Sequence, residues 1–487
     1  MLFNSFSFAL FLPIVFLLYW FSTKGNLKRQ NILLIIASYF FYACWDWRFL
    51  FLLIFSTLLD FYSGAKIEAA KSKQERKFWL WLSICINLGF LGVFKYYNFF
   101  ADSFSEALSF IGLKANLGTL NIILPVGISF YTFHGLSYVI DIYNNRIKHE
   151  KNFINYSLFV CFFPLLVAGP IERATHLLPQ VLRKREFNYA KAVNGMQQIL
   201  WGLFKKIVIA DNCAEHANAI FNHSGNYSGS TLILGALFFT FQIYCDFSGY
   251  TDIALGTAKL FGFELLRNFS FPYFSRDIAE FWRRWHISLS TWFRDYLYIP
   301  LGGSKGGTLV KIRNTFIIFL VSGFWHGANW TFIIWGLLNA IYIMPSIISN
   351  TNRNHLDTVA KGKLIPSPIE FFSIAFTFML TVFAWIFFRA ENLHHAISFI
   401  YGIFSGITQK AAYIETINYL IWNVGLTLPI LITIFMLIEW LGREEAFALA
   451  KINYNTRRYV RWGIYYAIII IIFLYSGKEQ QFIYFQF

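Results

Sequence analysis

The sequence predicts an all-α polytopic membrane protein. Of its 487 residues, 57% are hydrophobic and only 14% are charged, and apolar runs follow one another from end to end. A helix needs about 20 apolar residues to cross the hydrocarbon core, and we expect roughly eleven such crossings. No polar stretch is long enough to form a soluble domain, so residues 1–487 are expected to form a single transmembrane domain.

The net charge of +15 is interpreted through membrane topology, because Lys and Arg concentrate in short loops on the cytoplasmic side of membrane proteins. The expected inner loops are Lys24–Arg29, Lys66–Lys77, Asn144–Lys151, Arg183–Arg185, Lys205–Lys206, Lys305–Arg313 and Arg443–Arg461. The loops around Asp102–Asn116 and Asn212–Gly229 carry fewer basic residues and are expected outside, as are both termini. Basic residues that are spread over short loops also argue against binding to nucleic acid.

Some apolar segments are too short or too interrupted to cross a bilayer. Ile122–Phe133 and Phe159–Pro170 contain Gly or Pro within short apolar runs. Such segments are tolerated at membrane depth where they line a cavity or are buried in protein. We therefore expect re-entrant or buried pieces at both places.

A histidine and an asparagine interrupt one apolar region in the second half of the chain. His326 and Asn329 lie between the apolar runs Phe316–Val321 and Trp330–Leu338. An ionisable group at membrane depth is costly and is usually functional. Because the ordinary pKa of histidine suits proton transfer near neutrality, His326 is the first candidate for a catalytic base.

The densest polar stretch is Ser275–Leu301, which we interpret as a helix lying at the membrane interface. One face is a stripe of large apolar side chains with spacings of three and four: Trp282, Trp285, Leu289, Trp292 and Tyr296. The other face carries Arg283, Ser290 and Arg294, and His286 lies at the border. The tryptophans are expected to anchor the helix, whereas the arginines suit an anionic group.

Four aspartates lie in apolar surroundings. Asp246 and Asp252 suit three roles equally: orienting a histidine, binding a cation, or hydrogen bonding within a broken helix. For Asp60 and Asp141 a satisfied structural role is expected. The five cysteines show no metal-binding or redox spacing, so no metal site is predicted.

Five segments closely resemble the membrane-bound O-acyltransferase family, in its branch of alginate and peptidoglycan O-acetyltransferases. They are Ser129–His134, Val167–Ile171, Asp246–Tyr250, Phe281–His286 and Gly323–Gly327. The resemblance covers nearly the whole chain. It implies a bundle of helices around a central tunnel, in which a cytoplasmic donor passage meets an external funnel.

The resemblance also implies a mechanism. His326 would be the essential histidine and His286 the second signature histidine. Acetyl-coenzyme A would be the donor substrate, with its phosphates near Arg283, Arg284 or Arg294. Asn329 and Asp246 are further expected to contact substrate.

The C-terminal run Phe482–Phe487 is aromatic. On composition alone an interfacial belt is favoured. The run also resembles the C-terminal motif of the small membrane peptide of teichoic-acid D-alanylation, in which a tyrosine is the proposed acyl carrier. That likeness implies that Tyr484 carries the acetyl group to an external partner.

The expected partners follow from the same resemblance: a periplasmic acetyltransferase, membrane lipid and a polysaccharide acceptor, with no metal or prosthetic group. Peptidoglycan is the favoured acceptor, because the abundance of Phe, Ile, Asn and Lys indicates an AT-rich genome. Alginate or another exopolysaccharide is the alternative. A transporter of a lipid-linked sugar or small anion is a minor alternative, since no paired broken helices are found in two corresponding halves.

Overall fold

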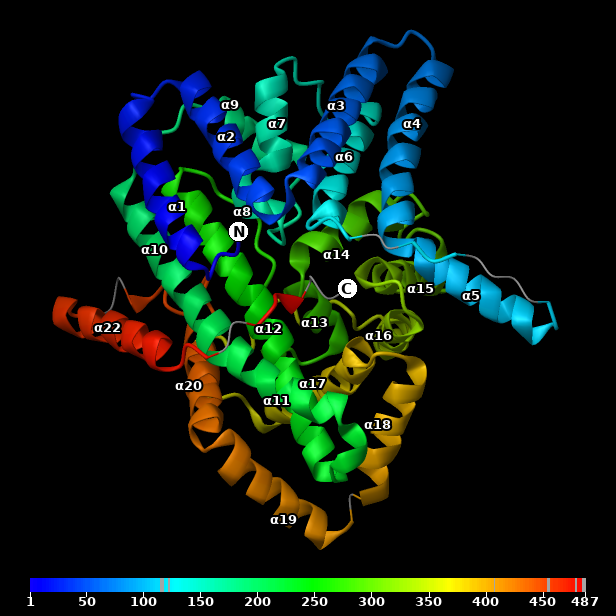
Figure 1. The fold of residues 1–487 in the computed structure, drawn as a ribbon, viewed down its shortest axis with the longest axis vertical. Helices are drawn as coiled ribbons and strands as arrows, with labels where there is room; N and C mark the ends of the chain where they lie inside the picture. Colours follow the sequence, from blue (N-terminus) through cyan, green and yellow to red (C-terminus); the bar gives the residue numbers. More distant parts are fainter. Residues whose placement is uncertain (114–117, 121–122, 407, 453–455, 478–479, 484–487) are drawn as a thin grey trace. The chain divides into compact units, whose positions relative to one another are not determined.

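The computed structural model describes residues 1–113, 118–120, 123–406, 408–452, 456–477 and 480–483. All regular elements in these residues are helices, which confirms the predicted all-α class (Figure 1). The chain forms two compact units. Unit 1 contains residues 1–195 and 257–266, and unit 2 contains residues 196–256 and 267–487.

Unit 1 is built from the N-terminal helices. They are α1 (Phe6–Leu17), η1 (Leu18–Ser22), α2 (Leu27–Asp46), α3 (Arg48–Ala69), α4 (Lys73–Leu91), η2 (Gly92–Tyr96), α5 (Tyr97–Phe110), α6 (Ile128–Tyr143), α7 (Phe153–Cys161), α8 (Phe163–Leu166) and α9 (Ala174–Leu182). Two further helices contribute residues to both units: α10 (Tyr189–Leu203) and α12 (Gly229–Leu260).

Unit 2 contains the remaining helices. They are η3 (Phe204–Ala210), α11 (Asp211–Asn222), η4 (Ser224–Asn226), η5 (Pro272–Phe274), α13 (Ile278–Arg284), α14 (Ile287–Phe293), η6 (Arg294–Tyr298), α15 (Gly307–His326), α16 (Trp330–Ile348), α17 (Pro368–Arg389), α18 (Leu393–Gly406), α19 (Lys410–Tyr419), η7 (Leu420–Val424), α20 (Thr427–Gly442) and α22 (Arg458–Leu474).

Among the described residues, six helical stretches are long and apolar enough to cross a membrane, and a seventh is obtained if the bent pair α19–α20 counts as one span. The six are Arg48–Ala69, Lys73–Phe110, Gly229–Leu260, Gly307–His326, Trp330–Ile348 and Pro368–Arg389. The predicted count of about eleven crossings is therefore not confirmed. Several apolar runs fold into helices shorter than a span, such as α7 with nine residues.

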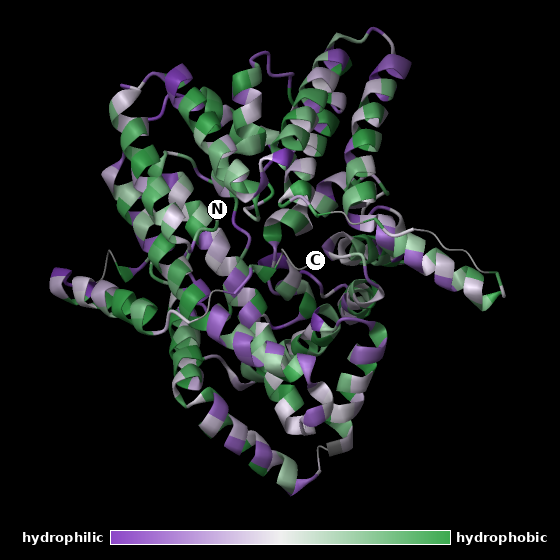
Figure 2. Ribbon diagram, viewed as in Figure 1, coloured by the Kyte–Doolittle hydropathy of each residue, from purple (hydrophilic) through white to green (hydrophobic). Residues whose placement is uncertain are grey.

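Hydropathy along the ribbon fits a membrane protein. In Figure 2 apolar residues run along α3 and α4, whereas the turn that joins these two helices is hydrophilic. At least half of the surface of Phe51, Phe55 and Phe78 on these helices is exposed. An apolar side chain on the outside of a helix suits contact with lipid better than contact with water.

Asp60 has the structural role that the sequence predicts. Its carboxylate accepts hydrogen bonds from Ser83 (2.7 Å) and Asn87 (2.8 Å) on α4. α6 comes close at this point because Gly135 has no side chain, and a Cβ there would lie 1.9 Å from the Asp60 carboxylate. Asp141 is likewise satisfied, by an ion pair of 3.0 Å with Arg146. The buried Asp60 carboxylate thus joins α3 to α4 by hydrogen bonds, and α6 packs closely against it.

The segment Phe159–Pro170 is buried within unit 1, as predicted. It ends α7, forms the four-residue helix α8 and continues into a loop. His134 on α6 contributes to the same region, because its Nε2 accepts a hydrogen bond from the backbone N–H of Glu172 (3.1 Å). This histidine therefore has a structural contact in unit 1.

Candidate active site

His326 is the last residue of α15 in unit 2, and its ring is 4% exposed. The chain then turns through Gly327 and enters α16 at Asn329, whose side chain caps the helix by accepting the N–H of Thr331 (3.0 Å). The turn is tight, since a Cβ on Gly327 would lie 2.1 Å from the ring of Phe332. The histidine is thus held at a rigid helix end.

α15 and α16 pack against each other with backbones in near contact. A Cβ on Gly323 would lie 2.3 Å from the carbonyl oxygen of Phe332, and a Cβ on Gly336 would lie 2.3 Å from that of Phe319. Small residues at a helix crossing allow this approach and are common between membrane helices. The crossing fixes the end of α15 and with it the position of His326.

His286 lies where the structure corrects a prediction. The expected single helix over the polar stretch is wrong, because α13 ends at Arg284 and α14 begins at Ile287. His286 between them has a left-handed backbone with a φ of 42°. Tertiary hydrogen bonds stabilise the break. The N–H of Ser270 donates to the carbonyl of Arg284 (3.0 Å), and the N–H of Ile287 donates to the carbonyl of Asn268 (2.9 Å). Helical periodicity carries no information about such bonds.

The tryptophans of this stretch are packed in the protein core, so the interfacial anchor is also corrected. Trp285 is 1% exposed and packs against Trp385 in a tilted arrangement, with ring centroids 5.0 Å apart. Trp282 donates its indole N–H to Asn339 (3.1 Å) on α16. Two short helices with buried aromatic faces carry His286 into the interior of unit 2.

The break brings the two histidines together. The ring centroids of His286 and His326 are 6.3 Å apart, and both rings are buried. Trp325 lies against both, at 5.9 Å from His286 and 4.8 Å from His326. Trp335 (5.1 Å) and Phe388 (5.3 Å) present edges to His326. The two imidazoles therefore belong to one buried cluster of aromatic rings.

Burial lowers the pKa of His286 to about 3. Its ring is therefore neutral at physiological pH and is a weak base. A neutral imidazole can still donate one hydrogen bond and accept another. His326 stays the predicted base, on the grounds given by the sequence.

Lys205 and Lys206 are buried in η3, which overturns the expectation that they form a cytoplasmic loop. They are 3% and 5% exposed. Lys206 pairs with Asp246 (2.8 Å) and Asp211 (2.7 Å), and Lys205 pairs with Asp252 (2.5 Å). The structure gives Asp246 and Asp252 a role outside the three that the sequence left open, because both form ion pairs with buried lysines from an unbroken helix α12.

These lysines are functional candidates that the sequence interpretation missed. The available signal was that Lys205 and Lys206 stand in an apolar run, Leu203 to Ala210, without Gly, Pro or another polar residue to form a loop. Buried charges of one sign require partners of the other sign. Two lysines and two isolated aspartates in apolar segments could thus have been paired.

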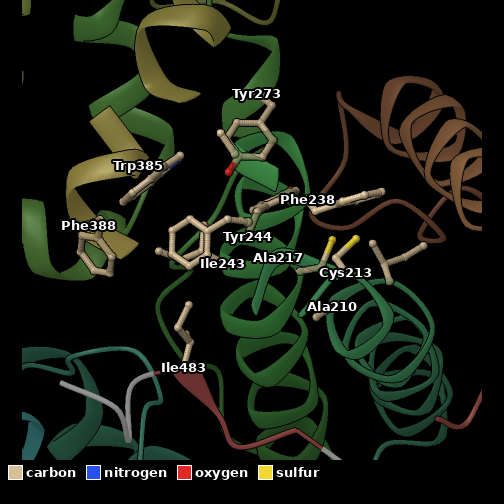
Figure 3. Close-up of a cluster of buried hydrophobic side chains, with 14 of the residues drawn as sticks. Ala210, Cys213, Ala217, Phe238, Ile243, Tyr244, Tyr273, Trp385, Phe388 and Ile483 are labelled. Atoms are coloured by element: carbon tan, nitrogen blue, oxygen red, sulfur yellow. The ribbon is translucent and has the colours of Figure 1, made fainter. Parts of the chain in front are cut away.

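The C-terminal segment enters the core of unit 2 beside Asp246. The N–H of Ile483 donates to the Asp246 carboxylate (2.8 Å), and Lys206 donates to the carbonyl of Gln480 (3.3 Å). Figure 3 shows Ile483 pointing towards the buried cluster around Ile243 and Tyr244. Phe482 is 2% exposed and Ile483 is 1% exposed, so this segment is part of the packed interior.

The same segment is linked by ring contacts to the aromatic cluster around the two histidines. Phe482 lies over Tyr250 with centroids 4.9 Å apart and approaches Phe247 (6.4 Å). Phe247 in turn presents an edge to His286 (4.8 Å). A continuous series of rings therefore joins the C-terminal segment to the histidine pair. Tyr484, the predicted acyl carrier, lies outside the described residues.

The arginines predicted to meet a phosphate have protein partners. Arg283 donates to the carbonyls of Asn352 (2.7 Å) and His355 (2.8 Å), and Arg284 pairs with Glu280 (2.8 Å). Arg294 is exposed and pairs with its neighbour Asp295 (2.7 Å). Their role in donor binding stays a prediction.

Asn329 also has structural contacts. Besides capping α16, its amide donates to the carbonyl of Glu391 (2.7 Å). Its predicted role in substrate binding is untested. In the part of the chain that the structure describes, no group of three or more His, Cys, Asp and Glu side chains is arranged to hold a metal ion.

Comparisons with known proteins identify the family of this chain. Residues 143–390, which include both histidines, match the model of the membrane-bound O-acyltransferase family. A probable alginate O-acetylase of Pseudomonas putida is 42% identical over 81% of this chain and 78% of its own length. The corresponding protein of Pseudomonas aeruginosa is 38% identical over 90% and 80%.

A peptidoglycan O-acetyltransferase of Helicobacter pylori is 37% identical over 83% of this chain and 80% of its own length. Relatives named for both acceptors thus match most of the sequence. The resemblance drawn from the motifs is confirmed, and so is the prediction of an acyltransferase. The chain belongs to the membrane-bound O-acyltransferase family.

Proposed function

We propose that this enzyme transfers an acetyl group from acetyl-coenzyme A to a hydroxyl of an extracytoplasmic polysaccharide, in the bacterial cytoplasmic membrane. The observation that carries the proposal is the buried His286–His326 pair, with the C-terminal segment bound beside it. The names of the relatives support an acetyl group and a polysaccharide.

In the proposed reaction His326 acts as the general base. A hydroxyl oxygen attacks the carbonyl carbon of the acetyl thioester while His326 takes the hydroxyl proton. The carbon–sulfur bond breaks, the thiolate receives a proton, and an acetyl ester and free coenzyme A result. Such a base contributes on the order of a hundredfold to ten-thousandfold.

His286 is proposed to position the reacting groups as a neutral imidazole. Its lowered pKa keeps the ring uncharged, so it adds no positive charge beside His326. A second charged imidazole would lower the basicity of the first. The aromatic walls exclude water, which protects the thioester from hydrolysis.

Tyr484 is proposed to take the acetyl group first and to pass it to an external partner. Its neighbour Ile483 is held by Asp246, and Phe482 belongs to the series of rings that leads to His286. A phenol has a pKa of about 10 and needs a base beside it to become a nucleophile. His326 is proposed as that base.

Peptidoglycan is our favoured acceptor and alginate the alternative. The chain is rich in Phe and Ile, as expected for an AT-rich genome, and relatives named for each acceptor have similar identities. A periplasmic acetyltransferase would receive the acetyl group. Arg294, which is exposed, is the best placed of the three arginines to meet the donor phosphates.

The test is transfer of labelled acetyl from acetyl-coenzyme A by the purified full chain in lipid nanodiscs. We expect a labelled protein intermediate that is lost in Tyr484→Phe, although this change keeps the aromatic surface. Undiminished labelling and turnover in Tyr484→Phe would instead support direct transfer at His326. The absence of any acetyl transfer to peptidoglycan or alginate, with the partner protein present, would refute the proposed function.

A further inference from the structure

Unit 1 contains a cavity of about 230 Å³ that plays no part in the proposed chemistry. This is about the volume that eight water molecules occupy in the liquid. It is lined by Trp20, Arg183, Lys184, Arg185, Glu186, Asn188, Lys191, Lys259, Leu260 and Gly262. All of these residues belong to the same unit.

The lining is strongly cationic. Five basic side chains face the cavity against one carboxylate, that of Glu186. Lys259 donates to the side chain of Asn194 (2.7 Å). Lys184 pairs with Glu186 (3.3 Å), and Lys191 pairs with Glu264 (2.5 Å). Both pairs are exposed and therefore weak. An excess of positive charge is left for an anion.

Two lining residues, Arg185 and Trp20, are held in place by contacts within the protein. Arg185 is 4% exposed, donates to the side chain of Asn31 and lies over the ring of Phe263 at 4.6 Å. Trp20 donates its indole N–H to the carbonyl of Leu260 (3.0 Å). Arg185 also donates to the backbone carbonyls of Gln180 (3.4 Å) and Val181 (3.5 Å), so it contributes a positive charge at a fixed place beside the cavity.

Apolar side chains continue from the cavity along the N-terminal helix. Leu17 and Phe21 flank Trp20 in sequence and are 53% and 73% exposed, and they belong to the apolar helix Phe6–Ser22. Phe187, which is half exposed, packs its edge on Trp20 with centroids 5.5 Å apart. Basic side chains next to an aromatic belt are typical of the level of lipid headgroups.

We propose that this cavity binds the phosphate of an anionic glycerophospholipid, with the acyl chains along the exposed face of α1 and η1. The charge excess selects an anion, and the apolar flank selects one that carries acyl chains. A soluble phosphate compound would use the charge and leave Leu17, Phe21 and Phe187 uncovered.

The experiment measures lipid retention by native mass spectrometry of the purified full chain. The probes are phosphatidylglycerol, phosphatidylcholine with the same acyl chains, and inorganic pyrophosphate as a soluble competitor. The variant is Arg183→Gln/Lys184→Gln. The matched control is Lys71→Gln/Lys73→Gln, which removes the same charge from another exposed basic loop of unit 1.

We expect wild type to retain phosphatidylglycerol in preference to phosphatidylcholine, and the cavity variant to bind it on the order of thirtyfold more weakly. The control variant should bind as wild type does. Equal losses in both variants, or equal retention of the two lipids, would overturn the proposal. Displacement of phosphatidylglycerol by equimolar pyrophosphate would also overturn it, because the site would then bind soluble phosphates.

Discussion

At the scale of single residues, the surroundings of His326 are unusual because its ring contacts are aromatic. The rings of Trp325, Trp335 and Phe388 pack against its imidazole, and none of these three side chains is charged. An imidazole in such a place costs free energy that a leucine would not. The cost is the reason that we propose a catalytic role for this histidine.

We therefore expect His326→Ala to lower acetyl transfer on the order of a hundredfold to ten-thousandfold, with normal membrane insertion. Ester-linked acetate on the isolated polysaccharide is the measurement. His394→Ala is the matched control, since His394 is exposed. Wild-type acetate in His326→Ala would exclude His326 as the base.

A second residue-scale prediction concerns pH. The pKa of His286 is about 3 in the folded protein against an ordinary value of 6.5. As the pH falls below about 6.5 the unfolded chain binds a proton that the folded chain excludes, so the free energy of unfolding decreases by about 1.4 kcal/mol per pH unit through this residue.

The melting temperature should accordingly fall less steeply between pH 6.5 and pH 5 in His286→Gln than in wild type. Other titrating groups are common to both proteins, so their effects cancel in the comparison of slopes. Parallel slopes would show that His286 takes up a proton in the folded state.

At the scale of elements, the C-terminal segment is held by one strong polar contact and by buried rings. Asp246 accepts the N–H of Ile483, and Phe482 packs on Tyr250. Loss of a buried phenylalanine side chain costs about 3–5 kcal/mol. A short segment cannot recover that amount from its few other contacts.

Phe482→Ala should therefore release the segment and abolish acetyl transfer. Release is measured as protease cleavage of a C-terminal tag in the solubilised protein. Phe473→Ala is the control, because it is the same substitution at a residue of α22 that is 77% exposed. Full activity and a protected tag in Phe482→Ala would contradict a role for this segment.

At the scale of the whole molecule, the alternation of basic loops predicts which surface faces the cytoplasm. Lys305 lies in the exposed loop before α15 and is expected inside, whereas His223 lies in the loop after α11 and is expected outside. Ser288 in the same region is unsuitable as a probe, because it is 1% exposed and bonds to Asn268 (2.5 Å).

In a background without the exposed Cys44 and Cys85, Lys305→Cys should react with an impermeant thiol reagent only after the membrane is opened. His223→Cys should react in intact cells. Labelling with the opposite pattern would invert the topology and place the donor on the other side of the membrane.

The sequence by itself determined the class of the molecule and its family, and it singled out His326 as the candidate base. Apolar content predicts membrane helices because burial in lipid depends on composition over about 20 residues. His326 could be found because a titratable group in an apolar run is visible locally. The family motifs were readable for the same reason, since each is a short contiguous segment such as Gly323–Gly327.

Only the tertiary structure decided how the site is assembled. The break at His286 depends on hydrogen bonds to residues 268–270, and the pairing of Lys206 with Asp246 joins positions 40 residues apart in the sequence. The C-terminal segment reaches Asp246 across 237 residues. Periodicity reports whether a side chain is buried, whereas the partner that satisfies a buried charge or a broken helix is set by the packing of distant segments.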